Sequence, residues 1–76
     1  MLGAMAMGTV KFYRDVKGWG AISSDELPEG CDAWVHFSVI VGDGYCCLTA
    51  GQRVEFTYEA AHQDSFRFRA TRVRVL

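Results

Sequence analysis

The fold is decided by residues 17–37, which open with K-G-W-G-A-I (17–22) and close with D-A-W-V-H-F (32–37). Successive side chains of a β-strand point to opposite faces, so parity sorts each segment onto two faces. Ile22 in the first segment and Val35 in the second are apolar residues that suit a core. The two segments therefore predict two strands of one sheet, with one face buried.

The opposite faces of these two strands carry the aromatic side chains. Trp19 shares its face with Ala21, and Trp34 shares its face with His36. If a core already covers the back of the sheet, both indoles and the imidazole face water. Exposed, clustered aromatics mark an interaction surface, and we predict one here.

Basic residues beside the aromatic cluster indicate the kind of partner. Lys11 and Lys17 lie in or next to the first strands. A surface of rings and positive charges suits a flat, π-rich, negatively charged chain, which describes single-stranded nucleic acid. The sequence thus predicts single-stranded RNA and DNA as the partners.

The charge balance argues against duplex binding, because the net charge is −1 and duplex binding depends on many phosphate contacts. The charges are nevertheless segregated. Three basic residues accompany the first strands: Lys11, Arg14 and Lys17. One loop collects four acids: Asp25, Glu26, Glu29 and Asp32. A second basic group follows the last strand: Arg67, Arg69, Arg72 and Arg74. Stacking must therefore supply much of the affinity.

The length of 76 residues predicts one small domain, which buries about 60% of its unfolded surface. No apolar run approaches the roughly 20 residues that cross a membrane. Residues 1–7 are apolar but lack the basic start and the length of a signal peptide. We interpret them as a flexible extension or a cloning remnant ahead of a domain at 8–76. A cytoplasmic location without membrane contact is the default.

Cysteine usage and motif content predict no cofactor, no metal site and no enzymatic activity. Cys31, Cys46 and Cys47 are odd in number and lack metal-type spacing, so we expect reduced thiols without a role. No C-x-x-C or H-x-x-x-H pattern accompanies His36 or His62. The chain also lacks a recognisable nucleophile motif, a phosphate-binding glycine loop and a paired-carboxylate pattern.

The rest of the chain predicts a closed all-β barrel, because short strands with mid-strand glycines favour closure over a flat sheet with open edges. The expected strands are, in order, 8–14, 19–24, 33–37, 52–60 and 66–75. Residues 38–41 suit a short helical turn that tucks Ile40 into the core. Residues 42–51 form a long loop, and 61–65 form a hairpin connection that leaves His62 in solvent.

Three local features leave alternatives open. The neighbouring rings of Phe12 and Tyr13 should face opposite ways, unless a bulge turns both to one side. A change of parity in the last strand predicts a second bulge near residues 70–71. Tyr45, in the long loop, either adds a stacking ring or packs down as a lid.

Four segments resemble bacterial cold-shock proteins in their order and spacing. They are G-T-V-K-F-Y (8–13), K-G-W-G-A-I (17–22), D-A-W-V-H-F-S (32–38) and A-G-Q-R-V-E-F (50–56). The resemblance covers nearly the whole chain and implies a five-stranded antiparallel OB-fold barrel that binds single-stranded RNA and DNA with weak sequence preference. It also implies the roles of an RNA chaperone and of a regulator of transcription and translation.

The same resemblance implies which residues bind nucleic acid. Carried over position by position, the binding face consists of Lys11, Phe12, Lys17, Trp19, Trp34, His36, Phe37 and Tyr45. Parity had already exposed most of them. Phe37 is the exception, since alternation places it on the core side and only the resemblance brings it to the binding face.

Departures from the family pattern concern the strength of binding. The family usually has tryptophan at Phe12 and phenylalanine at Trp19 and Trp34, and these exchanges keep a ring. At Ala21 the family normally has phenylalanine, so one stack is lost, which weakens binding roughly 5- to 150-fold at about 1–3 kcal/mol per base. Phe66 and Phe68 are candidates for a replacement ring.

A rival interpretation uses the same surface for protein contacts. The aromatic face could hold a peptide or a second copy of the chain, and the loop at 42–51 could act as a hinge for strand exchange. We expect mostly monomer, with a strand-exchanged dimer as the alternative. A self-associating barrel of this kind would bind nucleic acid weakly.

Overall fold

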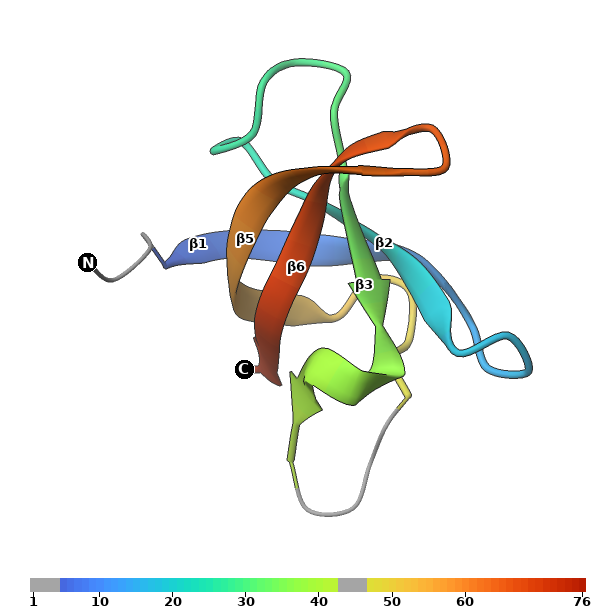
Figure 1. Cartoon of the computed structure of the whole chain (residues 1–76). Coiled ribbons are helices and arrows are strands. Elements are labelled where there is room, and N and C mark those ends of the chain that lie inside the picture. The colour runs from blue at the N-terminus through green and yellow to red at the C-terminus, as the bar shows by residue number, and fades with distance from the viewer. Residues whose placement is uncertain (1–4, 43–46) are drawn as a thin grey trace.

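The computed structural model describes residues 5–42 and 47–76, and it is an all-β protein (Figure 1). Its strands are β1 (Ala6–Arg14), β2 (Trp19–Ser23), β3 (Ala33–His36), β4 (Ile40–Val41), β5 (Arg53–Gln63) and β6 (Phe66–Val75). A single 3-10 turn, Phe37–Val39, is the helical element in the described part of the chain. None of the described helical structure has the length and apolarity required to traverse a bilayer.

The strands close into a barrel, as alternation and turn signals predict. The sheet order is β3-β2-β1-β5-β6-β4, and an additional pairing of β3 with β6 joins the two sides (Figure 1). Five strands form the barrel wall, and the two-residue β4 adds to its edge. Pairs between β1, β2, β3, β5 and β6 along the order are antiparallel, whereas β3 and β4 pair with β6 in parallel. The architecture is that of an OB-fold barrel.

Inward-facing side chains from all five long strands fill the barrel. The largest fully buried side chains are Val10, Ile22, Val35, Val54, Phe56 and Val73. The placement of Ile22 and Val35 in the core is therefore confirmed. Their partners across the barrel come from β5 and β6, so the face of β2 and β3 that carries the tryptophans is free to point outward.

Two strands extend further than expected. β1 begins at Ala6 rather than Gly8, because Ala6 is fully buried and pairs with Phe56 of β5. β5 continues to Gln63, so the segment 61–65 is mostly strand and not a connection. The hairpin turns at residues 64–65, where Asp64 has a positive φ of 54°. His62 is exposed as predicted, but in a strand.

A bulge in β1 settles the orientation of the two neighbouring rings. Val10 pairs with Ile22 and Phe12 with Ala21, so Lys11 is the extra residue. After this bulge Phe12 lies on the outer face, while Tyr13 packs against the core. The predicted second bulge is confirmed, because Thr57 pairs with Arg72 and Tyr58 with Ala70, which leaves one residue between them on β6.

The end of β3 also differs from the expectation. The strand ends at His36, and Phe37 begins the 3-10 turn, so the helical residues are Phe37–Val39 and not 38–41. Ile40 lies in β4, where it is half-buried and packs against the core. The alternation of buried and outward-facing side chains in β3 therefore ends at His36, one residue earlier than the sequence pattern predicts.

Substitution of Gly20 tests how closely β1 and β2 approach. A Cβ at Gly20 would lie 2.3 Å from the carbonyl oxygen of Phe12 and 2.9 Å from Cα of Tyr13. Both are backbone atoms that cannot move aside alone, so Gly20→Ala should lower the free energy of unfolding by about 3 kcal/mol or more. Chemical denaturation measures this loss.

Gly30→Ala is the matched control, because Gly30 has a positive φ of 83° and no atom within 4 Å of an added Cβ. Backbone strain alone costs about 1–2 kcal/mol there. Equal losses for the two variants would contradict the close approach as the reason for glycine at position 20.

Candidate functional site

Strand register places five residues in one lateral row on the outside of the barrel. Phe12 pairs with Ala21, Ala21 with Trp34, Trp34 with Arg69, and Arg69 with Glu59. The row crosses β1, β2, β3, β6 and β5, so it depends on three antiparallel pairs and on the parallel closure. Phe12 and Trp34, which were predicted from separate motifs, thereby lie on one surface. The ion pair of Arg69 with Glu59 lies beside them, a neighbour that the sequence pattern did not predict.

A second row brings two more predicted rings, those of Trp19 and His36, to the same surface. Trp19 pairs with His36 and contacts Phe12 edge-on, with 5.6 Å between ring centroids. The rings of Trp34 and His36 are stacked, with 5.6 Å between centroids and 21° between planes. All four rings are half-buried, so each packs on its neighbours and keeps part of its surface open.

Phe37 lies on this surface, as the family resemblance implies and alternation does not. Its side chain is 45% exposed, and its ring centroid lies 4.3 Å from that of His36. The 3-10 turn that begins at Phe37 rotates the side chain away from the core. Gly18 makes room for it, because a Cβ at Gly18 would lie 2.7 Å from Cδ2 of Phe37, and the φ of Gly18 is 75°.

Ala21 does not leave a gap in the surface. Its side chain is fully buried, although it lies on the outer side of the sheet and outside the core cluster. Phe12 and Trp34 are its lateral neighbours in register. Directly opposed side chains on one face of a sheet lie close enough to touch, so we infer that these two rings shield it. A base would therefore contact the rings of Phe12 and Trp34 rather than Ala21. The sequence pattern instead predicts that Ala21 leaves a position on the surface where a base could not stack.

One of the two candidate replacement rings joins the surface. Phe66, at the start of β6, contacts Trp19 edge-on with 6.2 Å between ring centroids. Phe68 instead packs against the core and contacts Tyr58. We define the aromatic face as Phe12, Trp19, Trp34, His36, Phe37 and Phe66.

Hydrogen bonds fix the chemistry of the His36 ring. Its Nδ1 accepts the backbone N–H of Ser38 at 3.3 Å, and the hydroxyl of Ser38 lies 2.8 Å from the same atom. Because Nδ1 is an acceptor, the neutral imidazole carries its proton on Nε2. The aromatic face therefore offers one N–H donor on His36.

A second donor on the aromatic face lacks a partner. The indole Nε1 of Trp34 is buried, and no described residue accepts its hydrogen. A buried donor without an acceptor costs about 1–3 kcal/mol.

The basic residues near the aromatic face are partly neutralised. Nζ of Lys11 lies 2.9 Å from Oδ2 of Asp32, so the acidic loop takes up one of the predicted charges. The guanidinium of Arg14 lies over the ring of Phe12, 5.2 Å from its centroid. Lys17 is exposed, and no described residue forms an ion pair with it.

Among the described residues, the other predicted candidates form no further site. Tyr45 and Cys46 lie outside the described residues, so the role of Tyr45 stays a prediction. Cys31 is a half-buried free thiol, and Cys47 is exposed. Over residues 5–42 and 47–76, no three His, Cys, Asp or Glu side chains gather closely enough to hold a metal ion.

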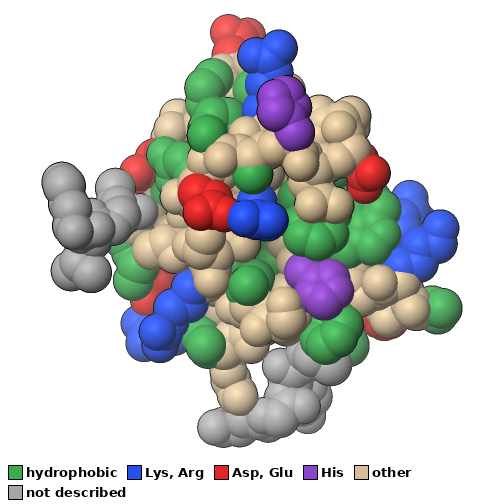
Figure 2. Space-filling view, in the orientation of Figure 1, with side chains coloured by type: hydrophobic (Ala, Val, Ile, Leu, Met, Phe, Trp, Pro, Cys, Tyr) green, Lys and Arg blue, Asp and Glu red, His purple; other side chains and the backbone are tan. Residues whose placement is uncertain are grey.

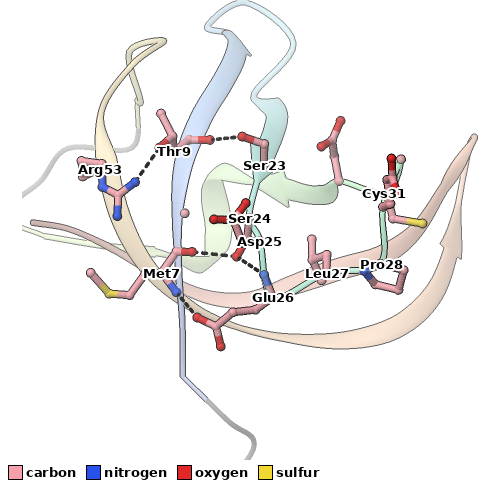
Figure 3. Close-up of a pocket in the computed structure, with 14 residues that line it drawn as sticks. Met7, Thr9, Ser23, Ser24, Asp25, Glu26, Leu27, Pro28, Cys31 and Arg53 are labelled. Atoms are coloured by element: carbon pink, nitrogen blue, oxygen red, sulfur yellow. Dashed lines mark hydrogen bonds between the residues drawn. The ribbon is translucent and has the colours of Figure 1, made fainter.

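A cavity of about 590 Å³ lies beneath the acidic loop, at the far end of β1 and β2 (Figure 3). Its polar groups bind one another: Glu26 accepts the N–H of Met7 at 2.9 Å, and the Ser24 hydroxyl donates to the carbonyl oxygen of Met7 at 2.6 Å. None of the described residues that line this cavity is aromatic. The hydrogen bonds around this cavity therefore attach the acidic loop to β1, and the cavity is not a second surface for stacking bases.

Comparisons with known proteins agree on one family. Residues 6–76 match the model of the 'cold-shock' DNA-binding domain. Cold shock-like protein CspA of Vibrio cholerae is 48% identical over 52 residues, which are 68% of this chain and 71% of that protein. Cold shock-like protein CspD of Haemophilus influenzae is 47% identical over 60 residues, covering 79% and 78% of the two chains. Cold shock protein CspC of Bacillus subtilis is 46% identical over 55 residues, covering 72% and 79%.

A double-mutant cycle tests whether Phe66 belongs to the aromatic face. Phe66→Leu and Trp19→Leu, alone and combined, should show a coupling energy of about 0.5–1.5 kcal/mol, because edge-on aromatic pairs contribute that much beyond buried area. Denaturant unfolding of the four proteins measures it. Additive losses would place Phe66 outside the face.

Proposed function

Because the chain belongs to the cold-shock domain family, we propose that it binds single-stranded RNA and DNA by stacking bases on the aromatic face. The observation that carries the proposal is the gathering of six rings from β1, β2, the β3 end and β6 on one outer surface. Every base has a π-face, so such a surface accepts many sequences.

Stacking supplies enough free energy for useful affinity. Each base stacked on an aromatic side chain contributes about 1–3 kcal/mol, so four bases contribute about 4–12 kcal/mol before the strand is ordered. Micromolar binding corresponds to about −8 kcal/mol. We therefore expect dissociation constants from low micromolar to high nanomolar.

Five residues of the face have a role in this proposal. Phe12, Trp19 and Trp34 stack bases, while Phe37 extends the face beyond the end of β3. Nε2–H of His36 donates to a base carbonyl, and Tyr45 remains a predicted further ring. The consequence is RNA-chaperone activity, since bases held on the protein cannot pair, together with regulation of transcription and translation through such strands. The function is binding and involves no catalysed reaction.

Phosphate contacts are few in this proposal. Lys17 is exposed and can bind a phosphate directly, whereas Lys11 must first break its ion pair with Asp32. With two or three such contacts, the logarithm of the association constant should fall against the logarithm of salt concentration with a slope of about −1.4 to −2.1.

Tryptophan fluorescence tests the stacking mechanism, because Trp19 and Trp34 are the two tryptophans of the chain. Short single strands of DNA and RNA should quench the emission, whereas duplex should not. Trp19→Ala and Trp34→Ala should each weaken binding about 5- to 150-fold, measured by titration with a labelled strand. A salt slope near −6, or no quenching by any single strand, would overturn the proposal; in the second case light scattering would reveal whether the face mediates self-association.

The ion pair of Lys11 provides a separate test of phosphate contact. Asp32→Asn should release Lys11, raise the affinity for single strands about two- to fivefold and steepen the salt slope by about 0.7. Asp25→Asn is the matched control, since Asp25 lies in the same loop and carries the same charge, and no described residue forms an ion pair with it. Equal effects of the two variants would mean that Lys11 does not contact phosphate.

A further inference from the structure

A groove of about 440 Å³ lies beside the aromatic face, between β3 and the β5–β6 hairpin. Its lining includes Trp34 and His36 on one side and Glu59, Gln63 and Arg69 on the other. Figure 2 shows this side of the molecule, where hydrophobic and histidine side chains lie next to a basic and an acidic side chain in contact. A base that stacks on Trp34 at its side nearest β6 would place its hydrogen-bonding edge in this groove.

Arg69 is the residue that such an edge would meet, because it pairs with Trp34 across the parallel closure. Its Nε and Nη2 both donate to Oε2 of Glu59. A guanidinium carries five N–H donors in a planar fork, so three donors remain for a ligand. The two side chains are 44% and 47% exposed, and ion pairs exposed to this degree hold weakly. Glu59 therefore orients the guanidinium of Arg69 without holding it rigidly in place.

The adjacent carboxylate decides between phosphate and base as the ligand of Arg69. Glu59 offsets the charge of Arg69 and repels a phosphate, whereas the edge of a base is neutral and suffers no such repulsion. Among the four bases, guanine presents two neighbouring acceptors, O6 and N7, which match two donors of one guanidinium. Single-stranded bases expose this edge while they stack on aromatic side chains.

We propose that Arg69, positioned by Glu59, gives this chain a guanine-selective subsite at the β6 edge of Trp34. The subsite deepens the proposed function and rests on it, because the base must first stack on the aromatic face. It adds selectivity for one base at one position of the bound strand, while the other stacking positions stay tolerant of sequence.

Binding of short thymidine strands that carry one guanine at each position in turn tests the subsite. For the unaltered protein, guanine at one internal position should raise the affinity about fivefold or more over the all-thymidine strand. Arg69→Gln should abolish this gain. Arg72→Gln is the matched control, since Arg72 is an exposed arginine of the same strand that lies beyond the bulge and does not line the groove; it should keep the gain.

Two further measurements identify the contact. Replacing the selected guanine by 7-deazaguanine, which lacks the N7 acceptor, should remove much of the gain, whereas inosine, which keeps O6 and N7, should retain it. The salt slope should be the same for Arg69→Gln and Arg72→Gln. A slope shallower by about 0.7 for Arg69→Gln alone would identify a phosphate contact and overturn the subsite.

The outcomes separate the subsite from the proposed function. Binding of all-thymidine strands with no preferred guanine position would overturn the subsite and leave stacking intact. Failure of the unaltered protein to bind any single strand would overturn both. Circular dichroism and thermal unfolding of Arg69→Gln would establish that the variant is folded before its binding is compared.

Discussion

The parallel pairing of β3 with β6 is the constraint on which the rest of the structure depends. It closes the barrel by joining Ala33 to Phe68 and Trp34 to Arg69. Without it, β3 would be the open edge of a sheet, with unpaired backbone groups available to another chain. The closure also turns the outer faces of β2 and β3 into one continuous surface with the β5–β6 hairpin. The core inside and the aromatic face outside are therefore two results of one pairing.

Two bulges adjust this surface at the level of single side chains. Lys11 is the extra residue in β1, and the resulting shift places Phe12 beside Ala21 and Tyr13 against the core. The second bulge, in β6, restores the inward direction of Val73 after Ala70. A strand with perfect alternation would have sent one of these apolar residues to the wrong side. Bulges commonly re-aim side chains in this way beside functional surfaces.

The charge pattern of the fold explains how a chain with net charge −1 can carry a nucleic-acid surface. Lys11, Arg69 and Arg74 each have a carboxylate partner, so much of the basic character is neutralised locally. The aromatic face then has to contribute more of the affinity than the phosphate contacts do. The large indole of Trp34 contributes to this stacking surface. It also lies beside the small, fully buried Ala21, which would otherwise interrupt the aromatic face.

The sequence by itself determined the five longer strands, most of the core and most of the aromatic face, whereas β4 stands where a helical turn was expected. Period-two alternation is a local property of the extended backbone, so Ile22, Val35, Trp19 and Trp34 could be assigned to their faces without knowledge of the pairing. The family motifs extended this assignment to Phe37, which alternation alone would have placed in the core.

Only the tertiary structure decided which side chains became neighbours. The covering of Ala21, the contact of Phe66 with Trp19 and the position of Arg69 beside Trp34 all depend on strand register. Register is set by bulges, by turns and by closure between segments far apart in the chain. Parity gives a side chain its face, but its lateral neighbour is fixed only when two strands have paired, because the same alternation is compatible with several registers.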